Sequence, residues 1–114
     1  MKVDKYSFGS ITIGGVEHCS DVIIYPDRVD DKWWRKEGHR LSIDDLKDVW
    51  PLKPKALVVG TGSPGLLKVD KEVEKRCRKD GIGLHVAPTA KAVEIYNQLA
   101  AGDANLVAAL HLTC

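Results

Sequence analysis

The stretch ALVVGTGSPG, residues 56–65, decides the architecture that we predict for this chain. Its first four residues form a continuous apolar run, which is typical of a buried strand covered on both faces. The run ends in Gly60, Gly62 and Gly65, which have the spacing of the dinucleotide-binding fingerprint G-x-G-x-x-G. A helix-like segment follows, so the stretch predicts a strand, a glycine-rich turn and then a helix.

The residues around this turn do not support a dinucleotide site. The fingerprint requires a helix that begins at its second or third glycine, but here Pro64 intervenes and the best helix cap is Asp70. No acidic residue stands near residues 87–89, where the ribose contact is expected. No Lys-Ser or Lys-Thr ends the loop, which excludes the Walker pattern. We therefore predict no nucleotide cofactor, and no other cofactor.

Two interpretations of the glycine-rich turn remain. It can be a sharp turn in which the glycines supply positive φ angles and Pro64 stiffens the path. It can also border a ligand crevice, because open α/β sheets place ligands at the carboxyl ends of their strands. In that case free backbone amides and the hydroxyls of Thr61 and Ser63 would hold a small anion or a polar group.

The second half of the chain alternates strands with helices. A helix is predicted from about Asp70 to Lys79 and ends at Gly81, and a strand follows over residues 82–87. Thr89 caps a second helix that runs to about Ala101, and residues 105–112 form a last apolar strand. The buried stripe of the first helix comprises Leu66, Val69, Val73 and Cys77. Such alternation predicts crossover units and a largely parallel sheet.

The first half predicts a β-hairpin. Residues 6–13 read as one strand, Gly14-Gly15 as a two-residue turn, and a second strand runs from Val16 until Pro26 stops it. Residues 27–40 are charged and irregular. The expected fold is one α/β domain, residues 1–114, with a central mixed, largely parallel sheet flanked by helices and an added N-terminal β-hairpin.

A short helix is predicted after the irregular segment. Ser42 can cap it, and Asp45 takes the third helical position, from which a carboxylate can bond back to the cap. This helix has to end before Pro51.

Composition excludes several classes of function. The 114 residues carry 17 Lys and Arg against 16 Asp and Glu, so a net charge of +1 gives no reason to expect nucleic-acid or membrane-surface binding. No run approaches the roughly 20 apolar residues of a membrane span, and residues 1–5 lack the apolar stretch of a signal peptide. We expect a cytoplasmic protein that neither inserts into membranes nor binds nucleic acid.

The sequence gives little support for a metal site or a catalytic cysteine. The cysteines, Cys19, Cys77 and Cys114, are widely spaced and form no C-x-x-C pair. His18 and Cys19 are adjacent, so in a strand they point to opposite faces. We predict no metal site and no catalytic residue, and the reactivity of Cys114, close in sequence to His111, stays open.

Trp33-Trp34-Arg35 is an aromatic cluster in a charged segment. The two rings can fold back as a lid over the core, or they can anchor a protein partner, since Trp and Arg are enriched at interface hot spots. A buried Trp34 favours the lid and the crevice, whereas an exposed Trp34 favours a partner.

Four stretches, WWRKEGHRL, LVVGTG, GIGLHVAPTAKAVEIYNQLAAGD and VAALHLTC, resemble the Mth-nine-three-eight-domain family over nearly the whole chain. The resemblance implies a layered α/β/α-type fold around a mixed sheet with a β-hairpin. The family includes a mitochondrial complex I assembly factor and a protein associated with adipocyte differentiation, and the resemblance implies no particular reaction. Its motifs match at Trp34, Arg35, Gly38, His39, Gly60, Gly62, Thr89, Tyr96 and Asn97.

These observations give two functional hypotheses. The first is a non-enzymatic protein-binding or assembly-assisting module with an unknown protein partner. The alternative is a protein or enzyme that binds a small anion or carboxylate in the glycine-loop crevice, in which the glycine turn and the segment from Trp34 to His39 border one cavity. The candidate binding residues are Trp34, Arg35, His39, Gly60, Thr61, Gly62, Ser63, Thr89 and Asn97.

Overall fold

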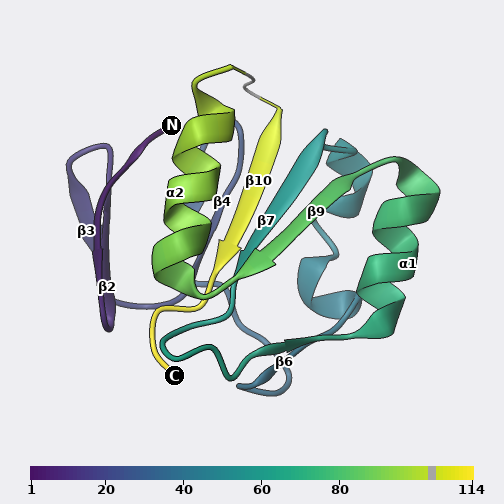
Figure 1. Ribbon diagram of the computed structural model, residues 1–114, viewed down its shortest axis with the longest axis horizontal. Coiled ribbons are helices and arrows are strands. Elements are labelled where there is room, and N and C mark those ends of the chain that lie inside the picture. Colours follow the sequence, from purple (N-terminus) through teal and green to yellow (C-terminus); the bar gives the residue numbers. More distant parts are fainter. Residues whose placement is uncertain (103–104) are drawn as a thin grey trace.

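A five-stranded sheet forms the middle layer of the computed structural model, which describes residues 1–102 and 105–114 (Figure 1). The strand order is β5-β4-β10-β7-β9. The bounds are β4 (Val22–Ile24), β5 (Val29–Asp30), β7 (Ala56–Gly60), β9 (Gly83–Ala87) and β10 (Leu106–Leu110). β10, β7 and β9 are parallel, whereas β4 pairs antiparallel with β10 and β5 antiparallel with β4. The predicted mixed, largely parallel sheet is confirmed.

The two central strands are buried along their whole length. β7 and β10 pair in register from Ala56 opposite Leu106 to Gly60 opposite Leu110, and every residue of both strands is buried. Because both faces of the sheet are covered, the sequence of these strands is continuously apolar rather than alternating. The predicted apolar run is thus the first part of a central strand.

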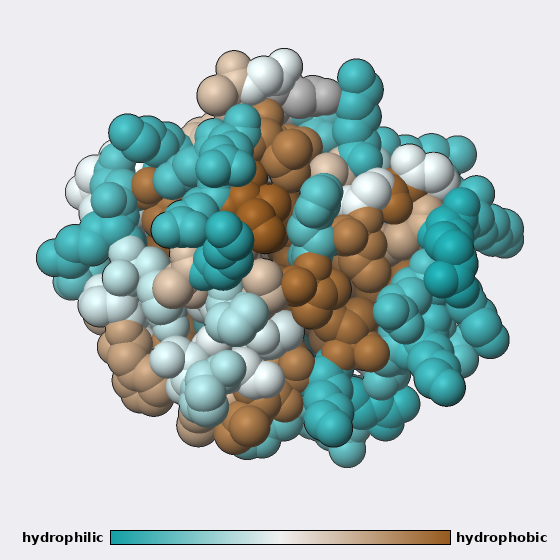
Figure 2. Space-filling model, viewed as in Figure 1, coloured by the Kyte–Doolittle hydropathy of each residue, from teal (hydrophilic) through white to brown (hydrophobic). Residues whose placement is uncertain are grey.

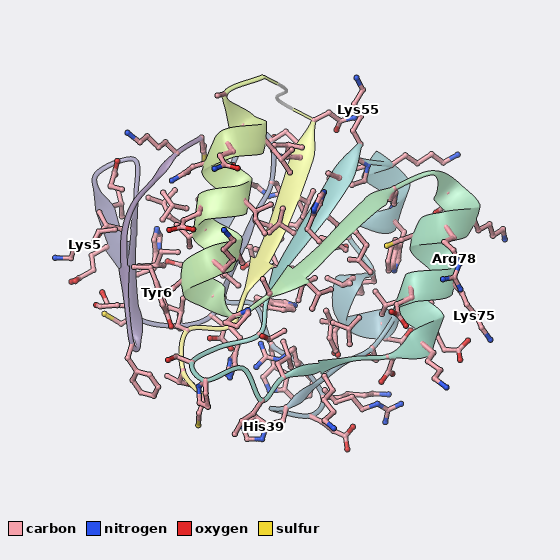
Figure 3. All side chains as sticks on the ribbon, viewed as in Figure 1. Lys5, Tyr6, His39, Lys55, Lys75 and Arg78 are labelled. Carbon is pink, nitrogen blue, oxygen red and sulfur yellow. The ribbon has the colours of Figure 1, made fainter. Side chains whose placement is uncertain are left out.

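One face of the sheet is covered by α1 (Lys71–Asp80), by two 3-10 turns, and by the short parallel pair β6 (Arg40–Leu41) and β8 (Lys68–Val69). The side chains of Lys75 and Arg78 project from α1 away from the sheet (Figure 3). The inner face of α1 is buried at Val73 and Cys77, as the stripe predicted.

The predicted stripe is wrong at its first residue. Leu66 is exposed and its neighbour Leu67 is buried instead. Residues 66–69 are not helical, because α1 begins only after Asp70 and β8 precedes it. Helical spacing therefore does not apply there. Asp70 is the N-terminal flanking residue of α1, but its carboxylate accepts a hydrogen bond from Arg40 Nε at 2.8 Å rather than capping the helix.

Two 3-10 turns replace the single short helix predicted after Ser42. These are η1 (Asp44–Leu46) and η2 (Trp50–Leu52). Asp45 bonds back as expected, since its Oδ2 accepts both the N–H and the hydroxyl of Ser42, at 2.8 and 2.9 Å. Pro51 lies in the first turn of η2, where its missing N–H removes no helical hydrogen bond.

The opposite face is covered by α2 (Thr89–Ala100) and by a separate three-stranded antiparallel sheet (Figure 1). This sheet consists of β1 (Val3–Ser7), β2 (Ser10–Ile13) and β3 (Val16–His18). The predicted Gly14-Gly15 hairpin joins β2 to β3, with φ angles of 56° and 84°. The predicted single strand over residues 6–13 is wrong, because a turn at Gly9, with φ of 79°, divides it into β1 and β2.

Of the three parallel strands, β9 lies at the edge of the central sheet. The face drawn in Figure 2 carries a strip of apolar residues between more hydrophilic ones, and Val86 of β9 is exposed. The predicted strand over residues 82–87 is confirmed as β9, with Ile82 buried just before it. None of the helices in residues 1–102 and 105–114 combines the length and the apolar character that a membrane crossing requires.

Cys77 provides a direct test of the helix packing. Its thiol is buried beside Val73, and burial, followed by the charge of Asp80, raises its pKa. Cys77→Ala is expected to lower the free energy of unfolding by about 1 kcal/mol, measured by chemical denaturation. Cys19→Ala is the matched control, because Cys19 is exposed. In the native protein a thiol reagent should label Cys19 rapidly and Cys77 slowly, and rapid labelling of Cys77 would contradict this packing.

Candidate functional site at the carboxyl ends of the central strands

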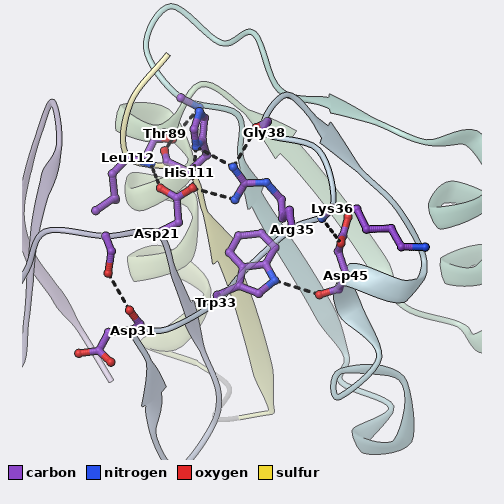
Figure 4. A network of polar contacts seen from close by, with 12 residues as sticks. Asp21, Asp31, Trp33, Arg35, Lys36, Gly38, Asp45, Thr89, His111 and Leu112 are labelled. Atoms are coloured by element: carbon purple, nitrogen blue, oxygen red, sulfur yellow. Dashed lines mark hydrogen bonds and ion pairs between the residues drawn. The ribbon is translucent and has the colours of Figure 1, made fainter.

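Three segments meet at the carboxyl ends of β7 and β10. The first is the glycine loop, residues 60–65, which follows β7, and the second is the segment 111–114 after β10. The third is the tryptophan loop, residues 33–39, which arrives from the opposite edge of the sheet beyond β5 (Figure 4). Parallel strands bring their carboxyl ends to one edge, so residues distant in sequence become neighbours here.

The carboxylate of Asp21 joins these segments. Its Oδ2 accepts a hydrogen bond from Arg35 Nη1 at 2.7 Å and lies 2.8 Å from His111 Nδ1 (Figure 4). Its Oδ1 accepts the N–H of Leu112 at 2.7 Å. Arg35 Nη2 donates to the carbonyl oxygen of Gly38 at 2.9 Å, so the same guanidinium also holds the backbone of the tryptophan loop.

The contacts of Asp21 determine that its carboxyl group is ionised and that His111 donates the proton between them. Burial alone would raise the pKa of Asp21, but hydrogen bonds from His111, Leu112 and Arg35, together with the charge of Arg35, outweigh it and lower the pKa to about 2. An ionised carboxylate only accepts hydrogen bonds, so the proton of this contact is on His111 Nδ1. The 3.1 Å approach of Arg35 Nη2 to the same nitrogen is then a packing contact.

Two nitrogen atoms of this network have no hydrogen-bond partner in the described part of the chain. They are Arg35 Nε and His111 Nε2, on side chains that are only 6% and 7% exposed. A neutral imidazole with its proton on Nδ1 carries a lone pair on Nε2 that can accept a hydrogen bond, whereas an imidazolium donates from Nε2.

Three backbone amides of the glycine loop, those of Thr61, Gly62 and Ser63, are used within the chain. Gly62 N–H donates to Thr89 Oγ1 at 2.8 Å, and Ser63 N–H donates to the carbonyl oxygen of Thr113 at 2.9 Å. Just beyond the loop, Leu66 N–H donates to the carbonyl oxygen of Cys114 at 3.2 Å. Segment 111–114 and Thr89 thus occupy donors that the crevice hypothesis assigns to a ligand.

Thr89 has a different role from the predicted helix cap. Pro88 is the N-terminal flanking residue of α2, and Thr89 is the first helical residue. Its hydroxyl donates to the carbonyl oxygen of His111 at 2.5 Å while it accepts the N–H of Gly62. Thr89 therefore joins the glycine loop to the residue that follows β10.

The remaining predicted site residues lie in different surroundings. Trp34 is 75% exposed. His39 is exposed, and its ring meets that of His111 edge to face with 6.1 Å between centroids. Thr61 is buried and Ser63 is exposed. Asn97 does not join the cluster: its Oδ1 accepts the N–H of Val3 and its Nδ2 donates to the carbonyl oxygen of Val3, both at 2.9 Å, which clamps β1 to α2.

A cavity of about 510 Å³ lies on the other side of the tryptophan loop. It is lined by Ile23, Tyr25, Asp30, Lys32, Trp33, Trp34, Lys36, Asp44, Asp45, Lys47 and Asp48. Trp33 is half-buried there and donates from Nε1 to the carbonyl oxygen of Asp45 at 2.9 Å. The glycine loop does not border this cavity. The two loops instead approach each other across His111, which contacts both Arg35 and the space beside Gly62.

The sequence prediction missed Asp21, and it considered His111 only as a neighbour of Cys114. Asp21 stands directly before the buried run of residues 22–25, and an acid at the start of a buried strand is the signal that could have identified it. Within residues 1–102 and 105–114, His, Cys, Asp and Glu side chains form no group of three or more that could hold a metal ion.

Comparison with known proteins gives one family. The model of the family described as "Protein of unknown function (DUF498/DUF598)" matches residues 3–111. The chain is similar to the conserved hypothetical protein PH1505 from Pyrococcus horikoshii OT3, with 27% identity, 100% of both chains covered and a TM-score of 0.84. It is also similar to MT938, with 26% identity, 99% of this chain and 98% of that chain covered and a TM-score of 0.82.

A third structure shows the fold alone. It is a protein from Bordetella pertussis described as a Mth938-like domain, with 19% identity, 97% of this chain and 85% of that chain covered and a TM-score of 0.68. No curated protein matches the chain.

The lowered pKa of Asp21 predicts a loss of stability in acid. Folding favours the ionised carboxylate, so its contribution is complete above the usual pKa of 3.8 and disappears as the pH falls through about 2. The difference corresponds to about 2 kcal/mol of unfolding free energy. Carbon NMR of the Asp21 carboxyl group should give the titration, and Asp21→Asn should remove this part of the acid dependence. Titration of Asp21 at or above 3.8 would contradict the network.

Gly62 tests the contact between the glycine loop and segment 111–114. A Cβ at this position would overlap the carbonyl oxygen of Thr113 and lie 2.8 Å from His111 Cδ2, with φ at 98°. Gly62→Ala should therefore cost about 3 kcal/mol of unfolding free energy, from backbone strain and overpacking together. Gly15→Ala is the matched control, because its φ of 84° is similar but no atom of the described residues lies within 4 Å of a Cβ added there. It should cost about 1 kcal/mol, and equal losses in the two variants would refute the contact.

Proposed function

The chain belongs to the DUF498/DUF598 family, the group of Mth938-like domains that its motifs resemble, and from this premise we propose that it is a protein-binding module whose contact surface is the tryptophan loop. The observation that carries the proposal is the 75% exposure of Trp34. An indole contributes about 150–250 Å² of area on burial, worth several kcal/mol at about 25 cal/mol per Å². A partner that covers Trp34 would thus gain several kcal/mol of binding free energy.

The loop holds Trp34 in place on both sides. Trp33 donates to the backbone of η1, and the buried guanidinium of Arg35 donates to Asp21 and to the carbonyl oxygen of Gly38. The N–H of Lys36 donates to Asp45 Oδ1 at 3.1 Å. A contact residue fixed by its neighbours loses less conformational freedom on binding, which favours affinity. In this proposal Arg35 positions the contact surface, and His39 lies at its margin.

The same geometry gives less support to the alternative, a small anion or carboxylate in the glycine-loop crevice. The amides of Gly62 and Ser63 are bonded within the chain, and both Nη atoms of Arg35 donate to protein oxygens. An incoming anion would have to displace these partners. We therefore favour a binding or assembly-assisting role without catalysis, in the cytoplasm.

Trp34→Ala tests this proposal. The variant and the wild type are immobilised and exposed to a lysate of the organism that carries the gene, and captured proteins are quantified and then purified for titration. We expect Trp34→Ala to weaken the purified complex about thirtyfold or more, because hot-spot tryptophans contribute about 2 kcal/mol or more. The unfolding free energy should change by no more than about 0.5 kcal/mol, since the ring is exposed.

Phe8→Ala is the matched control. Phe8 is also aromatic and 62% exposed, but it lies between β1 and β2, outside the tryptophan loop. It should retain the affinity of the wild type. If Trp34→Ala binds every captured protein as tightly as the wild type, the tryptophan loop is not the contact surface.

A further inference from the structure

We infer that the partner inserts an arginine side chain into the 510 Å³ cavity beside the tryptophan loop, which we call the aspartate cavity after Asp30, Asp44, Asp45 and Asp48 in its wall. This inference rests on the proposed function, because it specifies what the partner of the loop carries. Its support comes from an unpartnered tyrosine hydroxyl, unpaired carboxylates and two indole rings in one wall.

The hydroxyl belongs to Tyr25. This residue is 2% exposed and lines the aspartate cavity, and its hydroxyl has no hydrogen-bond partner among the described residues. Burial, followed by the charges of Asp48 and Asp30, raises the pKa of Tyr25. The guanidinium of Arg28, whose carbon lies 4.1 Å from the ring centroid, opposes the two carboxylates, but the pKa is still raised, so the hydroxyl is protonated at neutral pH. Its oxygen can accept a hydrogen bond, so a cationic ligand that carries donors is favoured there.

The carboxylates of the cavity differ in how far they are satisfied. Asp45 accepts three hydrogen bonds from Lys36 and Ser42, so its charge is already solvated by the chain. Asp30 accepts one bond, from the N–H of Lys32. In the described part of the structure, none of Asp30, Asp44 and Asp48 forms an ion pair with a basic side chain. A cation entering the cavity would thus meet carboxylates that lack a cationic partner.

The aromatic wall selects the kind of cation. One face of Trp33 is already covered by Arg35, whose guanidinium carbon lies 4.8 Å from the ring centroid, while Trp34 is uncovered. A guanidinium is planar, weakly hydrated and carries five donors, so it can stack on an indole and still reach several oxygens. An ammonium is compact and strongly hydrated, and it satisfies this combination less well.

Three lysines at the cavity restrict what can flank that arginine. Lys32, Lys36 and Lys47 are exposed, and Figure 4 shows the side chain of Lys36 directed away from Trp33. These charges repel further basic residues at the rim, since like charges brought together at an interface are unfavourable. The structure therefore favours a single arginine between neutral or acidic residues over a polybasic segment.

The test uses three acetylated, amidated peptides that differ only at a central arginine, lysine or citrulline between glycine and glutamate residues. Binding to the full chain is followed by NMR of the indole N–H signals. We expect the arginine peptide to shift Trp33 and Trp34 saturably and to bind about tenfold more tightly than the citrulline peptide, with lysine between them. The Trp50 indole, which donates to the carbonyl oxygen of Ile43, should not shift.

Two conservative variants connect the binding to the cavity. Asp48→Asn and Tyr25→Phe should each weaken the arginine peptide severalfold, whereas Glu94→Gln on α2, the control for loss of one negative charge, should not. Tyr25→Phe should leave the melting temperature unchanged or raise it, because the hydroxyl that it removes has no partner among the described residues. This separates a binding role from a structural one.

The outcomes for the two proposals are distinguishable. Equal affinity for the arginine and citrulline peptides, or unchanged affinity in Asp48→Asn, overturns the arginine inference. Protein capture that still depends on Trp34 would then leave the proposed function in place. Binding of the arginine peptide that disappears in Asp48→Asn and Tyr25→Phe supports the inference.

Discussion

The buried carboxylate of Asp21 is the constraint on which the functional end of the molecule depends. Its two oxygens hold the start of β4, the tryptophan loop through Arg35, and the residues after β10 through His111 and Leu112. A guanidinium that is 6% exposed cannot persist without such a counter-charge, because an unpaired buried cation costs several kcal/mol. The reverse also holds, since Arg35 helps to keep Asp21 ionised. Neither residue can be replaced alone without leaving the other charge unpaired in the interior.

From Asp21 and Arg35 the network of contacts extends in two directions. Toward β10, the carbonyl oxygen of Leu112 also accepts hydrogen bonds from the N–H of Gly9 and the hydroxyl of Tyr6, so the N-terminal sheet is attached to the same segment as Asp21. Toward the surface, Arg35 fixes the backbone on one side of Trp34 while Trp33 fixes it on the other. The backbone that carries the exposed indole of Trp34 is therefore held by contacts of both neighbouring residues.

Local sequence patterns predicted secondary-structure elements. The predictions failed where contacts between residues distant in sequence determine the role of a side chain. The run Ala56–Val59, the Gly14-Gly15 turn and the Val73 and Cys77 stripe are visible within a few residues, and the structure confirms them. Leu66 was misplaced because a helical period was continued into a segment that is not helical. Thr89 has the composition of a cap, yet its hydroxyl bonds to Gly62 and His111, 27 and 22 residues away. Asp21 and His111 are 90 residues apart, and no local signal connects them.

The glycine-rich turn lies where open α/β sheets usually bind ligands, but in this fold it contacts other parts of the chain instead. The carboxyl ends of parallel strands are where open α/β sheets leave a crevice, and the amides of such a turn can receive a ligand. Here Thr89 and Thr113 receive them, and Gly62 has no side chain because His111 and the Thr113 carbonyl fill the space. Within the described structure two buried nitrogen atoms at the strand ends, Arg35 Nε and His111 Nε2, lack partners, but the amides of Gly62 and Ser63 are bonded within the chain. The hydroxyl of Tyr25 and the carboxylate of Asp48 also lack partners, and they lie beside an uncovered Trp34. Recognition is expected where polar groups and apolar area remain open, and in this protein that place is the edge of the sheet beside β5 rather than the ends of its central strands.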